Sequence, residues 1–439
     1  MELTIEKLVY GGDGLGRIES EGRRKAVFVP LVLPGERVEA KVVEDRPAFA
    51  RARLERVVEP SPDRTSPPCP YFGECGGCHY QHATYEAQLK FKEQILRETV
   101  SRIAKSELPE IQVHASEPLH YRNRTRVKVA ASSGGNTKFV IGYYRLSSHD
   151  LLPVRECPIS SPPINRTLQA IWSMAITREL PVGLNEIEFF DTGDSSVLVE
   201  FIVDQKAETP KLIAFAQALQ KEAHEVVGVS AISRTALKDD AVAAPELSGG
   251  PSKAGLLLAG KPSARYRVKD LDYRVGVDAF FQTNRFLIPK MVDVVTTDAT
   301  GKLAMDLYAG VGLFTLPLSK HFDRVVAVEA SSASVQYLRQ NAPPHAKIVE
   351  ATTEAYVERG GQKPDYIVVD PPRAGLGKKV VDGLIRLSPK QLTYVSCDPS
   401  TMARDLTGLL AAGYRITATH LLDMFPQTFH IETILRLAR

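Results

Sequence analysis

Short apolar runs that alternate with helical segments fill the C-terminal part of the chain, and they restrict the available folds more than any other feature. Each run is nearly continuous in Leu, Val, Ile, Ala and Met. A strand of this kind is buried on both faces, as in a parallel sheet that helices cover on each side. We therefore expect an α/β domain at residues 271–439. Its clearest strands are predicted at 303–307, 324–328, 366–370 and 392–396.

The N-terminal segment has a different pattern, because short runs there alternate apolar and polar residues between Gly and Pro. Several short strands at regular spacing are typical of a small β-barrel, which we predict for residues 1–60. A Pro-rich linker follows, and residues 66–270 have a mixed α and β pattern with helical spacing from Tyr85 to Ile103. The barrel strands are predicted at 26–30, 37–43 and 50–57.

Composition limits the class of protein. A chain of 439 residues has room for two or three domains. Its net charge of +3 is too small to identify a nucleic-acid partner. No segment approaches the ~18–20 apolar residues of a membrane span, and residues 1–7 lack the pattern of a signal peptide. Five cysteines do not resemble a secreted disulfide framework. We expect a cytoplasmic protein without a membrane partner.

A nucleotide-type site is predicted where two of these strands end. Gly310 and Gly312 follow a predicted strand and open a helix, so the backbone can pass close to a ligand. Glu329 ends the next strand, where a carboxylate can accept hydrogen bonds from the two hydroxyls of a ribose. The third glycine of a dinucleotide fingerprint is missing, so S-adenosylmethionine fits better than NAD. The alternative, a plain tight turn, is disfavoured by Asp370 at the end of a later strand.

A lone cysteine marks a third strand end. Cys397 follows a predicted strand, while Asp398 and Pro399 have the features of a helix N-cap and first helical position. A helix N-terminus stabilises a thiolate, although Asp398 opposes that effect. An isolated cysteine is most often a buried structural residue, but this position favours a nucleophile.

A possible base lies near the C-terminus. On strand alternation, His430 and Glu432 share one face of a final strand. A carboxylate beside apolar residues can accept a proton, but the spacing alone does not distinguish this role from a solvated strand residue.

The other four cysteines are Cys69, Cys75, Cys78 and the distant Cys157. Four thiolates can hold a structural zinc or an iron–sulfur cluster. Zinc ribbons usually pair two Cys-x2-Cys knuckles, and this chain has one, so the spacing favours a 4Fe-4S cluster. Nearby His79 and His82 are not needed as ligands.

A run of basic residues suggests a phosphate-binding surface. Arg122, Arg124, Arg126 and Lys128 are spaced by two, so in a strand they project from one face. We predict a phosphate-binding stripe here, rather than a solvated sheet face of mixed charge.

These motifs together resemble the RNA uridine-5 methyltransferases (RumA/TrmA type), and the resemblance covers essentially the whole chain. The N-terminal segment is similar to a TRAM domain, an RNA-binding barrel, and the four spaced cysteines are similar to the 4Fe-4S pattern of the family. The matching motifs are Phe281–Asn284, Asp306–Gly312, Glu329, Asp370–Arg373, Ser396–Pro399 and His430–Glu432.

The resemblance implies an α/β multidomain enzyme with a TRAM-type barrel, a mixed α+β central domain that carries the cluster, and a Rossmann-like methyltransferase domain. It implies Cys397 as nucleophile and Glu432 as general base in methylation of uridine C5. A chain with both barrel and cluster is most similar to the branch that acts on 23S rRNA, with tRNA as the alternative RNA and a monomer as the expected state. Two rivals are an amine or small-molecule methyltransferase and a non-catalytic RNA-binding protein, and both leave Cys397 unexplained. The implied donor-binding residues are Gln282, Tyr308, Gly310, Glu329 and Asp370.

Overall fold

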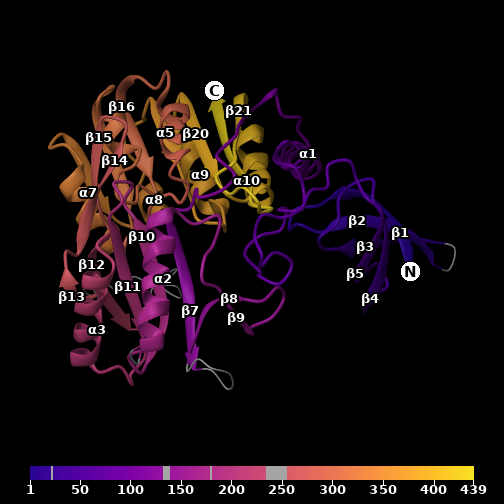
Figure 1. The fold of residues 1–439 in the computed structure, drawn as a ribbon. Coiled ribbons are helices and arrows are strands. Elements are labelled where there is room, and N and C mark those ends of the chain that lie inside the picture. Colours follow the sequence, from indigo (N-terminus) through magenta and orange to yellow (C-terminus); the bar gives the residue numbers. More distant parts are fainter. Residues whose placement is uncertain (21–22, 132–138, 178–179, 234–254) are drawn as a thin grey trace.

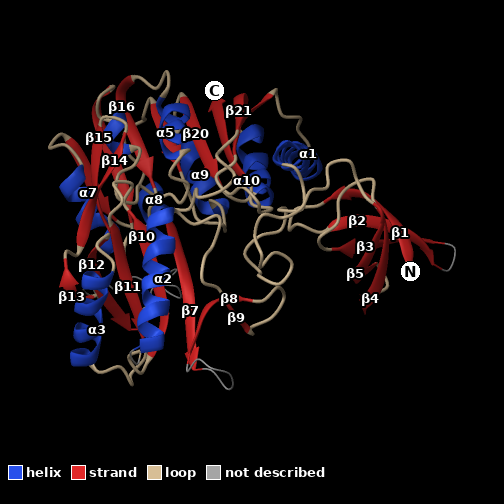
Figure 2. Ribbon diagram, in the orientation of Figure 1, coloured by secondary structure: helices blue, strands red, loops and turns tan. Residues whose placement is uncertain are grey.

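The structure is a computed structural model that describes residues 1–20, 23–131, 139–177, 180–233 and 255–439. A small barrel lies to one side of a larger body, and helix α1 (Tyr85–Ala104) lies between them (Figure 1). The larger body contains two extended sheets with helices packed against them (Figure 2). No helix in these ranges is long and apolar enough to cross a membrane.

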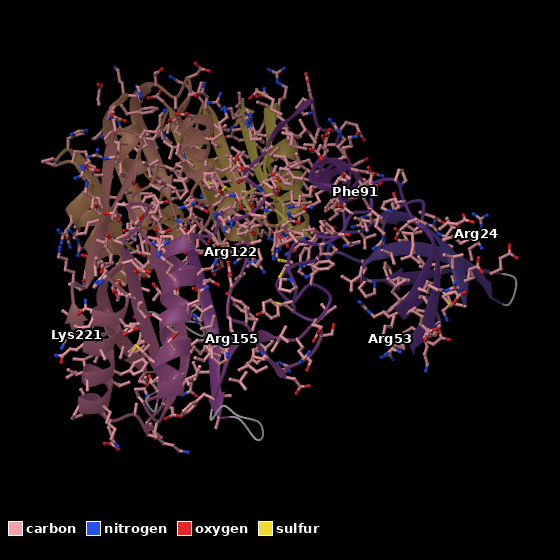
Figure 3. All side chains as sticks on the ribbon, viewed as in Figure 1. Arg24, Arg53, Phe91, Arg122, Arg155 and Lys221 are labelled. Carbon is pink, nitrogen blue, oxygen red and sulfur yellow. The ribbon has the colours of Figure 1, made fainter. Side chains whose placement is uncertain are left out.

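The N-terminal strands close into the predicted barrel, in the order β1-β2-β3-β5-β4. Alternate residues of β1 point inward, so that Leu3 and Ile5 are buried against Val27 and Val38. Arg24 and Arg53 point outward from the barrel (Figure 3). The strands are β1 (Glu2–Leu8), β2 (Gly14–Ser20), β3 (Arg23–Val29), β4 (Arg37–Asp45) and β5 (Phe49–Glu59).

The central part forms a seven-stranded sheet in the order β13-β12-β11-β10-β7-β8-β9. Helices α2 (Pro162–Thr177) and α3 (Thr209–Glu222) pack on it through a core that includes Trp172 and Phe215. The strands are β7 (Arg124–Ala131), β8 (Phe139–Tyr144), β9 (Leu151–Pro153), β10 (Leu184–Asp191), β11 (Val197–Val203), β12 (Val226–Ser233) and β13 (Leu256–Gly260).

The C-terminal part is built on an eight-stranded sheet in the order β18-β17-β16-β19-β20-β22-β21-β6. Its strands run parallel to their neighbours except β22, which is antiparallel to β20 and β21. The strands are β16 (Gly301–Leu307), β17 (Phe322–Glu329), β18 (Ala346–Glu350), β19 (Tyr366–Val369), β20 (Gln391–Ser396), β21 (Arg415–Leu422), β22 (Glu432–Ala438) and β6 (Ile111–His114).

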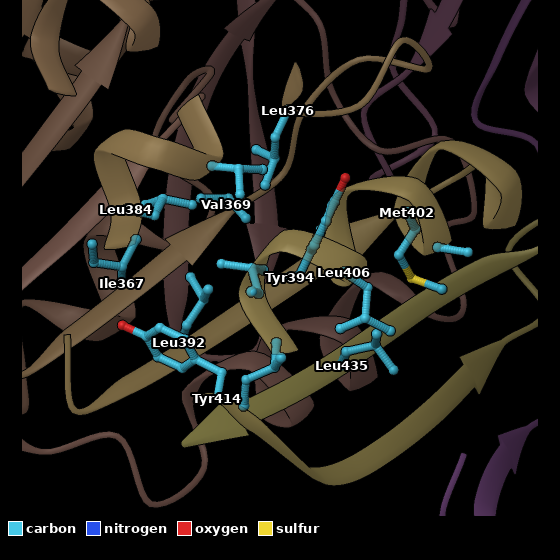
Figure 4. Packing of buried hydrophobic residues seen from close by; sticks show 14 of the residues in the cluster. Ile367, Val369, Leu376, Leu384, Leu392, Tyr394, Met402, Leu406, Tyr414 and Leu435 are labelled. Carbon is cyan, nitrogen blue, oxygen red and sulfur yellow. The ribbon is translucent and has the colours of Figure 1, made fainter. Parts of the chain in front are cut away.

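Both faces of this sheet are buried, as the continuous apolar runs predicted. In β19, Ile367 and Val369 pack into one core, whereas Val368 packs into the core of the opposite face. Helices α1, α8 (Thr353–Glu358), α9 (Gly377–Leu387) and α10 (Pro399–Ala411) supply the first core, which Figure 4 shows in part. The second core receives β14 (Ser263–Val268), β15 (Leu271–Gly276), α5 (Ile288–Thr296), α6 (Thr315–Leu318) and α7 (Ser332–Asn341).

The strand order reverses between β16 and β19, because β17 and β18 lie on one side of β16 and β19 and β20 on the other. At such a switch point the connections leave in opposite directions, and ligands bind in the crevice outside the carboxyl ends of the strands. Strand β6, from residues 111–114, pairs with β21, so the sheet also takes in a strand from far ahead of residue 271. The domain boundaries at 60, 66, 270 and 271 stay predictions.

Candidate active site

The structure brings the predicted site residues to one edge of the eight-stranded sheet. Glu329 ends β17, Asp370 follows β19 directly, and Cys397 follows β20. Glu432 begins the antiparallel strand β22 and therefore lies at the same edge. The predicted donor-binding residues Glu329 and Asp370 and the predicted nucleophile and base thus share one edge of the sheet.

The glycine turn after β16 is anchored by Glu329. The Glu329 carboxylate accepts hydrogen bonds from the backbone N–H of Gly310 at 2.8 Å, Ala330 at 2.9 Å and Ser331 at 2.7 Å. Gly310 has a φ of +55°, and a Cβ there would meet nothing within 4 Å, so the turn opens toward free space. Tyr308 also has a positive φ, of +67°, which a non-glycine residue adopts mainly where its surroundings enforce it. This geometry leaves room for a ligand against the backbone of the turn.

A second acidic group lies beside this turn. Gln282 is buried and donates a hydrogen bond from Nε2 to Asp370 Oδ2 at 3.0 Å. Burial raises the pKa of Asp370, and the neighbouring Asp306 raises it further. Burial likewise raises the pKa of Asp306 to about 7, although Thr315 Oγ1 donates to Asp306 Oδ2 at 2.6 Å. An uncharged or cationic ligand is therefore favoured here over an anionic one.

The helix start at Cys397 has the predicted form. Asp398 caps α10, since its Oδ1 accepts hydrogen bonds from the backbone N–H of Ser400 and Thr401, each at 2.9 Å, and Pro399 is the first helical residue. The two opposing effects predicted at Cys397 do not leave its pKa lowered. Burial raises the pKa of the Cys397 thiol to about 12, and the carboxyl groups of Glu432 and Asp370 add to the increase. Desolvation and negative neighbours outweigh the helix N-terminus, so Cys397 is a thiol at neutral pH.

Glu432 is almost fully buried, with 3% of its surface exposed. Its pKa is raised well above the usual range by burial and then by Asp370, whereas Arg373 lowers it. His430 precedes β22 instead of lying within it, so it does not share a strand face with Glu432 as predicted. Burial and Arg373 lower the pKa of His430 to about 3, and its neutral ring lies 3.4 Å from Arg373 Nη2.

The four remaining cysteines influence one another electrostatically. Burial raises the pKa of Cys78 to about 12 and that of Cys75 to about 11, and Cys157 contributes to both increases. The pKa of Cys69 is also raised, by burial and then by Cys157, although nearby backbone N–H groups lower it. Among the described residues, no group of three or more His, Cys, Asp or Glu side chains is arranged to hold a metal ion. The thiols thus lie in one region without forming a single-ion site.

The predicted phosphate-binding stripe is wrong, because its cations are already paired within the sheet. In the register between β7 and β10, Lys128 lies opposite Glu186 and Arg126 opposite Glu188. Arg126 Nε donates to Glu188 at 2.8 Å, and Lys128 Nζ lies 2.7 Å from Glu186. Arg124 donates to backbone carbonyl groups of the 276–279 segment, so its charge also points inward.

Arg122 does not belong to the stripe either. It precedes β7, and Figure 3 shows it where the central sheet meets the C-terminal part. Its guanidinium lies over the rings of Tyr121 and Phe425, 5.9 Å from each centroid. The face that appeared uniformly basic in the sequence is a mixed-charge face with internal ion pairs.

The sequence did not predict one contact beside Cys397. Tyr10, in the turn between β1 and β2, donates a hydrogen bond to Asp398 Oδ2 at 3.1 Å. The only signal in the sequence is an aromatic residue in a glycine-rich turn. Nothing in that signal relates the barrel to a residue almost 400 positions later.

Fold and site together define an α/β protein of the doubly wound type, in which a glycine turn anchored by Glu329, a cysteine and a buried carboxyl group lie at the carboxyl ends of the strands. Comparison with known proteins identifies the family. The family model described as tRNA (Uracil-5-)-methyltransferase matches residues 84–351 and 360–439, and that of the TRAM domain matches residues 1–54. The chain therefore belongs to the tRNA (uracil-5-)-methyltransferase family and is an S-adenosylmethionine-dependent RNA uracil-5 methyltransferase.

Relatives match the chain over nearly its full length. An "Uncharacterized RNA methyltransferase" of Aquifex aeolicus is 32% identical over 99% of this chain and 97% of its own. The 23S rRNA (uracil(1939)-C(5))-methyltransferase RlmD of Pectobacterium atrosepticum is 32% identical over 99% of this chain and 92% of its own. Among solved structures, the Pyrococcus abyssi tRNA (uracil-54, C5)-methyltransferase in complex with S-adenosyl-L-homocysteine is 25% identical. It superposes with a TM-score of 0.75 and covers 100% of both chains.

Proposed function

We propose that this enzyme methylates C5 of a specific uridine through a covalent bond between Cys397 and C6 of the uracil, with Glu432 as the general base. The observation that supports the proposal is that Glu329, Asp370, Cys397 and Glu432 come from four strands and share one edge of the sheet. Gln282, Tyr308, Gly310, Glu329 and Asp370 are the residues we propose to bind the methyl donor.

The chemistry requires a nucleophile because C5 of uracil does not attack a methyl group by itself. The Cys397 sulfur adds to C6, the S–C6 bond forms, and the electron pair of the C5=C6 bond makes C5 enolate-like. C5 then takes the methyl group from the sulfonium, whose sulfur–methyl bond breaks. Glu432 removes the C5 proton, the C5=C6 bond forms again, and Cys397 leaves as a thiolate.

Cys397 and Glu432 have to change their protonation states before these reaction steps begin. Cys397 must lose its thiol proton to solvent, and Glu432 must be ionised, yet the pKa of each is raised. S-adenosylmethionine supplies a methyl group on a positively charged sulfonium when bound. A positive charge near Cys397, Glu432 and Asp370 would favour their ionised forms, so donor binding would prepare both the nucleophile and the base.

RNA of the large ribosomal subunit is the substrate we favour. The target uridine has to leave its stack to reach a crevice at a sheet edge, which loops in RNA permit at low cost. Relatives that match 99% of this chain are named as 23S rRNA enzymes. The structural neighbour from Pyrococcus abyssi is named as a tRNA enzyme, so tRNA is the alternative substrate.

The substrate is tested by nucleoside mass spectrometry of 23S rRNA and bulk tRNA, each from wild-type cells, a deletion strain and a strain that expresses Cys397→Ala. Loss of 5-methyluridine from 23S rRNA in both mutant strains is the expected result. Loss of 5-methyluridine from tRNA alone would show that the same reaction takes place on tRNA instead of 23S rRNA. Restoration of 5-methyluridine by Cys397→Ala would contradict the covalent scheme.

We also propose that Cys69, Cys75, Cys78 and Cys157 hold a 4Fe-4S cluster, in which each iron takes one thiolate. Their mutual influence supports a shared site, and the backbone N–H groups beside the Cys69 sulfur favour a thiolate there. The segment after Cys78 contacts the loop that precedes Glu432. The backbone N–H groups of His79 and Tyr80 donate to the Gln427 carbonyl at 2.8 and 3.0 Å.

A cluster at these cysteines would hold that segment in place and has no electron to transfer in the reaction. Iron and acid-labile sulfide in the anaerobically purified enzyme, both lost in Cys78→Ser, are the expected result. Zinc in place of iron, or no metal at all, would contradict the cluster.

A further inference from the structure

The turn between β1 and β2 joins the barrel to the proposed active site. This turn, residues 9–13, has Gly11 at φ +111° and Gly12 at φ +98°, and the Val9 N–H donates to the Asp13 carbonyl at 2.9 Å. Positive φ values at both glycines let the chain reverse tightly. Tyr10 precedes them and packs against the same core as α10. The tip of a barrel hairpin is thus held against the methyltransferase part.

The Tyr10 hydroxyl lies at the nucleophile segment. It donates to Asp398 Oδ2 at 3.1 Å and lies 3.4 Å from the carbonyl oxygen of Cys397. A phenol has one proton to donate, and the closer, charged oxygen is the better acceptor. Burial and Asp398 raise the pKa of Tyr10, so it stays a donor at physiological pH. Because Asp398 Oδ1 caps α10, both oxygens of this carboxylate have partners.

The same turn contacts the loop that leads to the base. The rings of Tyr10 and Phe429 meet edge to face, 5.6 Å between centroids. A Cβ at Gly12 would be in ordinary van der Waals contact, at 3.4 Å, with atoms of both Phe429 and His79, so the turn packs against this loop and against the segment after Cys78. Phe429 lies three residues before Glu432 in the chain. One barrel turn therefore touches the segments of both the proposed nucleophile and the proposed base.

We infer that Tyr10 is a positioning residue that fixes Cys397 through Asp398 and so links the barrel to the methyl-transfer step. This inference rests on the proposed role of Cys397. General docking of the barrel has other contacts, including the packing of Leu8 in the shared core and the ion pair between Lys7 and Glu98 on α1. The hydroxyl of Tyr10 is not needed for that docking, because its ring makes the apolar contact.

The test compares Tyr10→Phe with Lys7→Met in the full-length enzyme. The assay is methylation of whichever RNA from the deletion strain lacks 5-methyluridine. Tyr10→Phe keeps the ring and is expected to lower kcat about tenfold, the loss typical of one hydrogen bond to a charged group, with KM for RNA unchanged. Lys7→Met, which removes an interface contact away from Cys397, is expected to keep the wild-type kcat.

A double-mutant cycle tests whether Tyr10 affects kcat through Asp398. Asn retains the cap at position 398, so Asp398→Asn removes the charge that Tyr10 contacts without removing the cap. Tyr10→Phe is expected to add little to the loss in Asp398→Asn, because both changes remove the same charge-assisted hydrogen bond. Additive losses would overturn the proposed path.

Other outcomes separate this inference from the proposed function. A kcat within twofold of wild type in Tyr10→Phe, or a loss confined to KM, would overturn the positioning role. An active Cys397→Ala enzyme would overturn the covalent scheme and this inference together. An inactive Cys397→Ala enzyme beside a fully active Tyr10→Phe enzyme would overturn only the role of Tyr10.

Discussion

The raised pKa of Cys397 should slow the alkylation of this residue in the free enzyme, and donor binding should reverse this. At pH 8 a cysteine with the ordinary pKa of 9.0 is about one-tenth thiolate, whereas one with a pKa of about 12 is about one part in 10⁴ thiolate. The nucleophilic form is therefore about 1,000-fold scarcer than in an ordinary cysteine.

The assay is alkylation by iodoacetamide between pH 7 and 10, read by mass spectrometry of the peptide that contains Cys397. The rate is expected to rise about tenfold per pH unit up to pH 10 without a plateau, because the thiol remains mostly protonated throughout. Glu432→Gln removes a negative neighbour, lowers the pKa of Cys397 and should speed alkylation at any fixed pH. Glu208→Gln, an exposed carboxylate before α3, is the matched control and should change nothing.

Two ligands test the role of the sulfonium charge. S-adenosylmethionine should speed alkylation of Cys397 relative to S-adenosylhomocysteine, which has the same adenosyl frame without the positive charge. A plateau near pH 8 or 9, or equal rates with the two ligands, would refute the electrostatic account of Cys397.

Three further predictions follow from particular contacts. Glu432→Gln should accumulate a methylated covalent RNA–enzyme complex, visible on denaturing gels, because the C5 proton is no longer removed; turnover at the wild-type rate would contradict this. Lys92→Met should lower the free energy of unfolding by about 3–5 kcal/mol in urea denaturation, because it leaves Asp423 buried without the ammonium group that contacts it. Arg126→Gln should leave the salt dependence of RNA binding unchanged, because Glu188 already neutralises this cation. If the slope of log affinity against log salt concentration became smaller by about 1, Arg126 would be a phosphate contact after all.

The strand-end residues were predictable because their signals are local. Glu329, Asp370 and Cys397 each follow a continuous apolar run, and parallel strands bring their carboxyl ends to one edge. The cap at Asp398 and the helix start at Pro399 were predictable for the same reason. These features depend on a few neighbouring residues and on one rule of sheet geometry.

The failures depend on contacts between distant segments. Arg126 and Lys128 are neutralised by Glu188 and Glu186, which lie about 60 positions later, and nothing in the basic run indicates which strand pairs with it. The position of Cys397 just before α10 was predictable from local signals. The raised pKa of Cys397 is caused by burial and by carboxyl groups from other strands, which the sequence does not place.

Tyr10 is the clearest example of a long-range contact, because it joins the first hairpin to Asp398, next to Cys397. The proposed cluster, unlike these contacts, was predicted from the sequence. The cysteine pattern predicted it, while the described residues hold no single-ion site, so metal analysis has to decide it.

The most direct test of the covalent scheme uses RNA that contains 5-fluorouridine at the target site. Fluorine at C5 cannot be removed as a proton, so the reaction should stop after methyl transfer with the RNA still bound to the enzyme. Intact-mass analysis should find the enzyme plus the RNA plus one methyl group, peptide mapping should place the link at Cys397, and Cys397→Ala should form no complex. A complex attached at another residue, or none with an enzyme that methylates the unfluorinated RNA, would contradict the account.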